Sequence, residues 1–524
     1  MGRNRSVSNG VLSIGHGLKA MRCFYVAVLL AVLALVPLTA CGGPGSEGQV
    51  GGALRIATSA DTKTLDPALL ITNPDIWITD QIYDKLIEKR NDTTLKPELA
   101  VSWEPNEDIT SYTVKLREGV KFHSGKEFTS EDVVFTYKRL LDPDIASPAR
   151  SELSSIEDVV AVDKHTVRFE LTAANAFFPQ SLALYHAKIL PANVDTSKLT
   201  METDGTGPFV LTELLVGQRA VLKRNPDYWD KGKPYVEDVI FFYMPGAESR
   251  VEALKTGSVD AVYPLSATEA LGLDEAPGCK VLEVASASYL NLIMDVTQEP
   301  FTNKKVRQAF QAATDREAIL QTACMGRGAI GTDTPISPED PYFHPEMKIP
   351  AYDIERAKQL LEDAGYPDGI EVTLHSSDVQ PGQMEMAVAF KESAAPAGIK
   401  VNIKREPEEI YWSTIWLNVP FMACNWLGRI PDGALSVVMM SDAPWNEAHY
   451  QNPELDALIM KARTQVDFES QKQTYLEVYN ILVEDVPRII PVFTPVLIGL
   501  RDNVQGLSPH AGKFLLLEDT WLGR

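Results

Sequence analysis

Cysteine is scarce in this chain, which has five among its 524 residues: Cys23, Cys41, Cys279, Cys324 and Cys424. No two of them form a C-x-x-C pair, and histidines such as His123, His375 and His449 are not paired at metal-ligand spacing, which argues against a zinc, nickel or haem site. The hydrolase motifs H-E-x-x-H and G-x-S-x-G are missing as well. We therefore expect no metal, no cofactor, no catalytic residue and no enzymatic activity.

Basic residues are too few to balance the acidic ones: 49 Lys and Arg stand against 71 Asp and Glu, a formal net charge of −22. The body is more acidic still, because residues 1–40 hold four basic residues and no acidic one. Such a charge repels nucleic acid, so no nucleic-acid partner is expected. The 45% apolar content is enough for a sizeable core, and the length suits two or three domains.

The apolar run Phe24–Leu38 has 15 residues, whereas a membrane-spanning helix needs about 20. Lys19 and Arg22 precede it, and Leu38-Thr39-Ala40-Cys41 closes it. This order is typical of a secretory signal that ends in a lipobox, so residues 1–40 are expected to be a lipoprotein signal peptide and Cys41 the lipidated residue. An ordinary signal peptide with an incidental cysteine is the alternative, and Met21 is an alternative start.

The segment 41–52 is rich in glycine and has almost no bulky side chains, so we expect a flexible tether behind the lipid anchor. Three cysteines then remain, Cys279, Cys324 and Cys424. Because their number is odd, at most one disulfide can form, and we expect free, buried thiols.

Strand and helix patterns alternate through the rest of the chain, which predicts an α/β fold. Tyr112, Val114 and Leu116 alternate as in a half-buried strand, and Thr129 stands three residues before Asp132 as a helix N-cap. Further expected helices cover 75–87, 250–255 (capped by Ser249), a segment after the cap Asp353, and 468–484. The apolar segment 489–500 is expected to be buried.

The exact amino-acid sequence of these segments is more informative about the protein's family than their periodicity is. The block LREGVKFHSGKEFTSEDVVFTYKRL begins at Leu116, and GTGPFVL, NPDYW, LKTGSVDAV, EPFTNKKVRQAFQAATDREAI and AKQLLEDAGYPDG follow in order from Gly205 to Gly369. Together they closely resemble the extracellular solute-binding proteins of family 5, the peptide-, nickel- and oligosaccharide-binding receptors of ABC importers.

This resemblance implies a type II periplasmic-binding-protein-like fold, with two lobes joined by a hinge and an extra inserted subdomain. Lobe I is expected at 53–90, 200–285 and 486–524, the inserted subdomain at 91–199 and lobe II at 286–485. The crossings near 286 and 486 would form the hinge.

The resemblance also implies a function: a monomeric, exported receptor, lipid-anchored on the outer face of the cell membrane, that captures a small peptide-like solute between its lobes. It would deliver the solute to the permease subunits of an ABC importer. Sugar, opine or metal-chelate binding by the same fold stays open, as do a receptor that presents its ligand to a sensor, a chaperone or adhesin with a vestigial cleft, and a hydrolase.

The stretch FMACNWLGRIPD, residues 421–432, is the most informative about the ligand. Peptide-binding relatives commonly have Trp-x-x-Asp here, and their Asp binds the α-amine of the peptide, whereas this chain has Trp426-Leu427-Gly428-Arg429. Arg429 inverts the charge and favours a carboxylate, phosphate or hydroxyl group. The alternative is that Arg429 is a structural residue paired with Asp432 or another local acid.

Four further residues are candidate ligand contacts. Trp426 belongs to the same motif, and Tyr289 and Asn291 fall where relatives line the cleft. The fourth is Trp412, which stands four residues before Trp416, so the two tryptophans share one helix face. Core packing is the alternative for this tryptophan pair.

Overall fold

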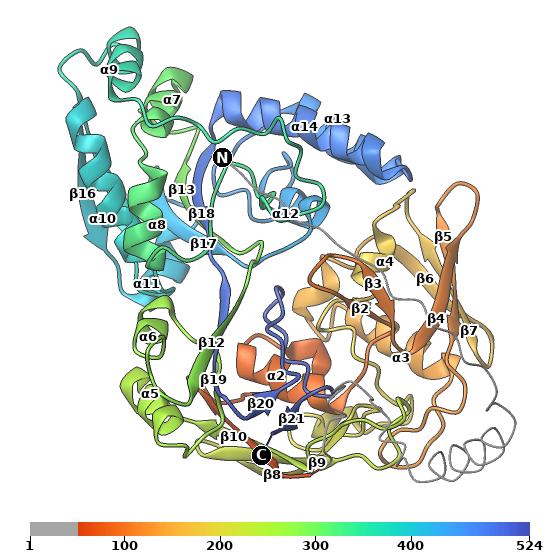
Figure 1. Cartoon of the computed structure of the whole chain (residues 1–524). Coiled ribbons are helices and arrows are strands. Elements are labelled where there is room, and N and C mark those ends of the chain that lie inside the picture. Colours follow the sequence, from red (N-terminus) through yellow and green to blue (C-terminus); the bar gives the residue numbers. More distant parts are fainter. Residues whose placement is uncertain (1–50, 524) are drawn as a thin grey trace, which may run out of the picture. The chain divides into compact units, whose positions relative to one another are not determined.

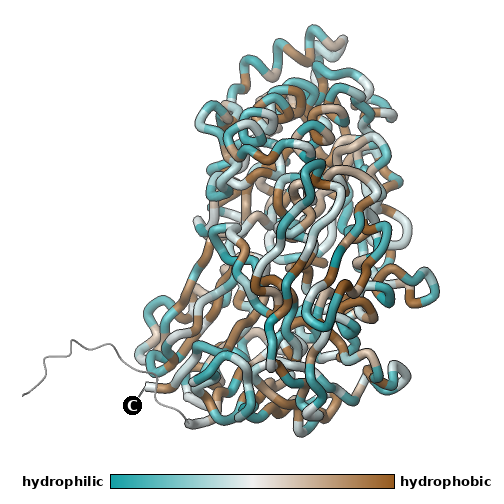
Figure 2. The backbone as a smooth tube through the Cα atoms, turned by 90° about the vertical axis from the view of Figure 1, so that its right-hand side faces the viewer, coloured by the Kyte–Doolittle hydropathy of each residue, from teal (hydrophilic) through white to brown (hydrophobic). Residues whose placement is uncertain are grey.

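The computed structural model describes residues 51–523. The expected signal peptide, Cys41 and most of the expected tether therefore lie outside the described residues. Short hydrophobic and hydrophilic stretches alternate along the chain, as the hydropathy-coloured tube in Figure 2 shows. Within residues 51–523, no helix combines the length and the apolar character that crossing a bilayer requires.

A seven-stranded sheet forms the core of the part that we call lobe I (Figure 1). Its strands, in spatial order, are β12 (Cys279–Val284), β19 (Val496–Arg501), β11 (Ala261–Val262), β1 (Ala53–Thr58), β10 (Asp238–Tyr243), β9 (Arg219–Arg224) and β8 (Phe209–Leu215). Helix α2 (Asn73–Ile82) packs on one face, while α5 (Ala247–Lys255) and α6 (Ala267–Leu271) cover the other. Apolar residues therefore fill both faces of this sheet, as in other α/β folds.

A six-stranded sheet forms the core of lobe II, in the order β14 (Ala329–Ile330), β18 (Arg488–Phe493), β13 (Tyr289–Met294), β17 (Phe421–Trp426), β15 (Ile370–Ser376) and β16 (Ile399–Arg405). Strand β13 is buried along its whole length. Leu290, Leu292 and Met294 face the helices α7 (Lys304–Ala312), α8 (Arg316–Cys324), α9 (Ile354–Asp363) and α10 (Gln383–Ala394). Tyr289 and Ile293 face α12 (Pro431–Val438), α13 (Pro453–Thr464) and α14 (Phe468–Asp485), as the period of two in a strand requires.

A smaller sheet builds the inserted subdomain, in the order β4 (Ala100–Pro105), β5 (Ser111–Leu116), β7 (Thr166–Leu171) and β6 (Ile156–Asp163). Helix α3 (Ser130–Leu141) covers it, and the short α4 (Phe178–Ser181) and the hairpin β2 (Ile87–Lys89) and β3 (Leu95–Pro97) lie beside it. Tyr112, Val114 and Leu116 are buried, which confirms the predicted alternation in β5. Thr129 and Asp132 form the predicted capping box of α3.

Several predicted element boundaries are confirmed and others are wrong. Asp353 caps α9, and α14 begins at Phe468, both as predicted. Helix α2 ends at Ile82 instead of continuing to residue 87. Helix α5 begins at Ala247 with Gly246 as its cap, so Ser249 lies inside the helix, because Arg250 donates to the carbonyls of Met244 and Pro245 (both 2.9 Å) and ties down that first turn. The cysteines Cys279, Cys324 and Cys424 are free thiols, the first half-buried and the others buried.

Two chain segments cross between lobe I and lobe II, and they lie side by side. The first joins β12 to β13, and the second joins β18 to β19. The Ser286 hydroxyl donates to the Thr494 carbonyl (2.8 Å), and the Thr494 amide donates to the Ser288 carbonyl (2.8 Å). The second crossing therefore lies at residues 494–495, later than the expected boundary near 486, because the apolar segment 489–500 holds two strands that belong to different sheets.

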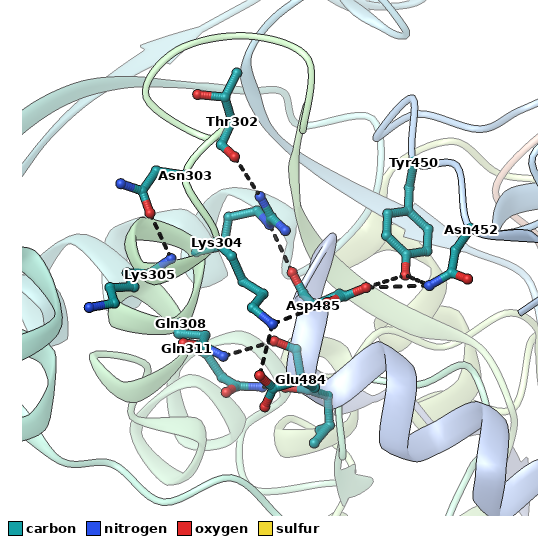
Figure 3. A network of polar contacts seen from close by, with 12 residues as sticks. Thr302, Asn303, Lys304, Lys305, Gln308, Gln311, Tyr450, Asn452, Glu484 and Asp485 are labelled. Carbon is teal, nitrogen blue, oxygen red and sulfur yellow. Dashed lines mark hydrogen bonds and ion pairs between the residues drawn. The ribbon is translucent and has the colours of Figure 1, made fainter. Parts of the chain in front are cut away.

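A network of polar contacts joins the end of α14, just before β18, to the start of α7 and to Tyr450 (Figure 3). The Asp485 carboxylate accepts a hydrogen bond from the Tyr450 hydroxyl (2.5 Å), and the Glu484 carboxylate pairs with Lys304 (2.9 Å). The Arg307 guanidinium donates to the Asp485 carbonyl (2.8 Å), and the Gln308 amide donates to the Glu484 carbonyl (2.9 Å). Side chains from the start of α7 thus satisfy the last carbonyls of α14, which would otherwise lack partners.

Candidate ligand-binding site

A cavity of about 680 Å³ lies between the inserted subdomain and lobe II, beside the first crossing. Its walls come from five parts of the chain: residues 89–93 of the β2–β3 hairpin, 151–185 of the inserted subdomain, 285–287 of the crossing, 337–340 and 427–463 of lobe II, and 510–514 near the C-terminus. Much of the wall is apolar, with Phe177, Leu184, Ile430, Met440 and Phe514 among its residues. A cavity of this size suits a small molecule.

One end of this cavity is closed by contacts between the inserted subdomain and lobe II. The Ala176 amide donates to the Arg463 carbonyl (2.8 Å). The Phe177 ring packs against Tyr342 and Tyr475, with ring centroids 6.0 and 6.4 Å apart. The cavity therefore belongs to an arrangement in which the subdomain and lobe II touch.

The loop that follows β17 brings Arg429 to the cavity wall, and Gly428 fixes this loop against the first crossing. The Gly428 amide donates to the Ser288 hydroxyl (3.0 Å). A Cβ atom at position 428 would lie 3.0 Å from the backbone carbon of Ala287 and from the backbone nitrogen of Ser288. This approach is tighter than most Cβ contacts, so a side chain at position 428 would require the first crossing to shift by a few tenths of an ångström.

Arg429, one of the predicted ligand contacts, lines the cavity, and its partners there are loose. Its guanidinium lies 3.9 Å from the carboxylate of Glu152 and 5.4 Å from the centre of the Trp426 ring. Within residues 51–523 it makes one hydrogen bond, a 3.5 Å contact to the Leu427 carbonyl. A guanidinium has five N–H donors, so Arg429 keeps donors for a ligand.

Of the expected alternative, an ion pair of Arg429 with Asp432 or another local acid, the pair with Asp432 is not formed, and Glu152 is the acid that Arg429 approaches. Asp432 instead pairs with Arg463, with Nε 2.8 Å from the carboxylate, and Arg463 also contacts the Ser436 hydroxyl. Burial raises the pKa of Asp432, and the charge and hydrogen bond of Arg463 act against that rise. Asp432 and Arg463 thus neutralise each other in the wall.

Opposite charges also face the cavity from Lys89 at the end of β2 and from Asp340 of lobe II. Burial lowers the pKa of Lys89 to about 8, although the Asp340 charge acts in the other direction. Burial likewise raises the pKa of Asp340, against the hydrogen bond from the Tyr342 amide (2.8 Å) and the Lys89 charge. Burial therefore disfavours both the protonated form of Lys89 and the ionised form of Asp340, unless a group of opposite charge compensates each of them.

Trp426 does not line the cavity but supports the wall from behind. Its indole N–H donates to the Glu447 carboxylate (3.0 Å), which also accepts from the indole of Trp416 (2.7 Å) and from Arg488 (3.1 Å). The side chains of Glu447 and Arg488 are 0% exposed. This buried cluster holds the Trp426 ring under the Arg429 guanidinium.

Tyr289 and Asn291 are buried in the sheet rather than in the cavity wall. Tyr289 pairs in register with Trp426 and packs edge-on against Phe493, with ring centroids 5.8 Å apart. The Asn291 amide nitrogen, in the orientation that satisfies both of its polar atoms, donates to the Cys424 carbonyl (2.8 Å), and its oxygen accepts from Arg488 (3.2 Å). Their role as ligand contacts remains a prediction.

Trp412 lies outside the cavity wall as well, on the π-helical turn Tyr411–Ile415. Its side chain is 40% exposed, so core packing does not account for it. Its ring packs edge-on against Trp416, with centroids 5.6 Å apart. A ligand contact by Trp412 also remains a prediction.

Three histidines named in the sequence have other partners. His375 contacts the Glu406 carboxylate (2.8 Å), His449 contacts the Asp295 carboxylate (3.0 Å), and His123 contacts the Gly207 carbonyl (3.0 Å). Within the described part of the chain, no group of three or more His, Cys, Asp or Glu side chains is arranged to hold a metal ion.

Comparison with known proteins connects this architecture to one family. The profile described as bacterial extracellular solute-binding proteins, family 5 Middle, matches residues 94–447. Heme-binding protein A of Haemophilus influenzae is 29% identical over 480 residues, which cover 84% of this chain and 87% of that protein.

Solved structures show the same likeness. The ABC transporter-associated periplasmic binding protein DppA from Helicobacter pylori, in complex with the peptide STSA, matches with a TM-score of 0.78 and 25% identity, over 91% of this chain and 99% of that one. The binding protein AgaA from A. tumefaciens R10, in complex with agropinic acid, matches with a TM-score of 0.76 and 27% identity, over 90% of this chain and 99% of that one. The fold is therefore that of a type II periplasmic binding protein.

Proposed function

The chain belongs to the bacterial extracellular solute-binding proteins of family 5, and we propose that it captures a small polar, peptide-like solute in the cavity between the inserted subdomain and lobe II. The family and the relatives are binding proteins and not enzymes. The names or titles of similar proteins mention heme, a peptide and agropinic acid, so the family alone leaves the ligand class open. The ligand class is therefore inferred from the residues of the cavity wall.

The observation that carries this proposal is Arg429 at the cavity wall with unused donors. A ligand carboxylate can accept two parallel N–H bonds from one guanidinium, and such charge-assisted bonds are roughly twice as strong as neutral ones. The surrounding apolar wall removes water from the contact, which strengthens it further. The solute that fits this wall has an anionic group that binds Arg429 and is amphipathic as a whole.

Titration calorimetry on solutes found in a thermal-shift library tests this assignment. Arg429→Ala is expected to weaken binding by roughly 10- to 150-fold, because a charge-assisted hydrogen bond contributes about 1.5–3 kcal/mol. Arg356→Ala is the matched control, since Arg356 is an exposed residue of α9 far from the cavity wall. If Arg429→Ala binds like the wild type but melts many degrees lower, Arg429 is a structural residue and the proposal is wrong.

We also propose that the protein is exported, anchored to the outer face of the cell membrane through lipid on Cys41, and works with ABC permease subunits as a monomer. The lipobox-like order of residues 38–41 and the glycine-rich segment after it support the anchor. Acyl chains bind a membrane with about 0.8 kcal/mol per buried CH₂, so two or three chains give stable attachment. Cys41→Ser should appear in the medium or stay unprocessed, and a cleaved variant that still partitions into detergent would contradict the anchor.

A further inference from the structure

Arg429 and Glu152 reach the same place in the cavity from opposite walls. Arg429 follows β17 in lobe II, and Glu152 lies in the loop before β6 of the inserted subdomain. Their side chains are 21% and 23% exposed, and 3.9 Å separates the guanidinium nitrogen from the carboxylate oxygen. At this distance the two groups attract each other without forming a hydrogen bond.

Tyr185 stands beside this pair and also lines the cavity. Burial raises the pKa of the Tyr185 phenol to about 12, the Glu152 charge adds to the rise, and the Arg429 charge opposes it. Three groups, a guanidinium, a carboxylate and a hydroxyl, thus line the same cavity.

The loose Arg429–Glu152 pair contrasts with the tight Asp432–Arg463 pair in the same wall. The latter has a 2.8 Å ion pair and a further contact to Ser436, so it has little capacity left for a ligand. The contact to Arg429 is the one ion pair that Glu152 makes in the described part of the chain. Of these two ion pairs, Arg429–Glu152 is the one whose charges remain open to a ligand.

We propose that this pair recognises a free α-amino-acid head, a carboxylate and an ammonium group on the same carbon, and that Glu152 is the residue that sets this specificity. The inference rests on the proposed function and names the ligand class of that cavity. The ligand carboxylate binds Arg429, and the ligand ammonium binds Glu152. Tyr185 flanks the head and offers its hydroxyl to either group.

Charge balance and geometry both favour such a head. Arg429 and Glu152 are neutral as a pair, so a ligand group of a single sign leaves one protein charge uncompensated in a partly dry site. The nitrogen and the carboxyl carbon of an α-amino acid are about 2.5 Å apart, because two bonds of about 1.5 Å meet at an angle of about 111°. Such a compact head can lie along the Arg429–Glu152 pair, whose charged atoms are 3.9 Å apart, with its dipole antiparallel to that of the pair. The end charges of a linear peptide are further apart and match this pair less well.

Three probes with the same apolar tail test the proposal by calorimetry on the full chain. Nε-benzoyl-lysine carries the complete head, 6-benzamidohexanoic acid carries only the carboxylate, and N-benzoyl-1,5-diaminopentane carries only the ammonium. The wild type is expected to bind the complete head about 10- to 100-fold more tightly than either single-charge probe.

Variants then assign the two halves of the head. Glu152→Gln should bind the complete head and the carboxylate-only probe within about threefold of each other, because the ammonium contact is lost. Arg429→Ala should likewise bind the complete head and the ammonium-only probe within about threefold of each other, because the carboxylate contact is lost. Glu157→Gln, an exposed acid of the same subdomain, is the control and should keep the wild-type ratios.

Two results would overturn the proposal: equal binding of all three probes by the wild type, or an equal loss for all three in Glu152→Gln, which would indicate a structural role. If none of the probes binds while another solute from the library does, the head-group assignment is wrong and the proposed function stands. If no solute binds at all, the proposed function is wrong as well.

Discussion

Replacing Glu447 by alanine is expected to have two effects: it should destabilise lobe II, and it should disturb the cavity wall. The carboxylate accepts hydrogen bonds from Trp416, Trp426 and Arg488, and it is 0% exposed. Without it, the Arg488 guanidinium would remain buried without its carboxylate partner, although it still donates to the Val438 carbonyl (3.0 Å). Breaking a buried ion pair on one side costs about 3–5 kcal/mol, and the two orphaned indole N–H groups add to this cost, though not additively.

The expected change is large enough for a simple assay. At about 2–4 °C per kcal/mol for a cooperative unit of 150–250 residues, the midpoint should fall by roughly 6–20 °C in a thermal melt followed by circular dichroism. Tryptophan emission should shift to the red, because Trp416, Trp426 and Trp445 lie in one cluster. Ligand affinity should fall too, since the Trp426 ring supports Arg429.

Glu392→Ala removes an exposed acid of α10 and is the control, with an expected change within about 0.5 kcal/mol. The reasoning would be refuted if Glu447→Ala unfolded within about 1 kcal/mol of the wild type. That result would mean that Arg488 finds other partners at little cost, and that the cluster does not position Trp426.

Three further predictions concern the crossing, the lobes and the cavity charge. Gly428→Ala places a Cβ 3.0 Å from backbone atoms of the first crossing, so titration should show weaker binding and denaturation a loss of about 1–3 kcal/mol; unchanged values for both would contradict the close approach. Arg327→Gln breaks the pair between lobe II and Asp274 of lobe I (2.7 Å), so ligand-free X-ray scattering should change while stability moves by about 1 kcal/mol or less; superimposable profiles would count against a lobe–lobe link. Lys89→Met should raise the free energy of unfolding most below about pH 8, and this gain should vanish towards pH 10.5. Between these pH values Lys89 in the unfolded chain binds a proton that native Lys89 has lost, so the wild type itself becomes more stable as the pH rises. A gain that is independent of pH would refute this reasoning.

Local signals in the sequence identified much of the fold. Three predicted features depend only on residues that are close together in the sequence: the N-cap at Thr129, the N-cap at Asp353 and the alternation in β5. All three are confirmed. Ser249 looked like a cap because serine suits that position. The helix begins earlier because the buried guanidinium of Arg250 binds carbonyls before it, and that guanidinium is in turn held by Glu269 (2.5 Å), which is not a neighbour in sequence.

The apolar segment 489–500 shows why a boundary inside a buried run is hard to predict. Strands β18 and β19 are buried on both faces, so neither has a period that marks its end. The break at residues 494–495 follows from hydrogen bonds to Ser286 and Ser288 across the crossing. Sequence periodicity does not contain that information.

The candidate site was accessible from sequence only in part. Arg429 was identified because it stands in a motif whose usual residue has the opposite charge. Its partner Glu152, and likewise Lys89 and Asp340, carry no local signal, because only the fold brings these distant segments to one cavity. Trp426 was expected at the ligand, but the pleat of β17 turns it towards Glu447 on the buried face.

Native mass spectrometry of the gently purified protein tests the central claim most directly. We expect the wild type to retain a small solute at a ratio of one to one, Arg356→Ala to retain the same solute, and Arg429→Ala to lose it. The identified solute should carry a carboxylate. Retention of the same solute by Arg429→Ala, or a solute without an anionic group, would contradict the account.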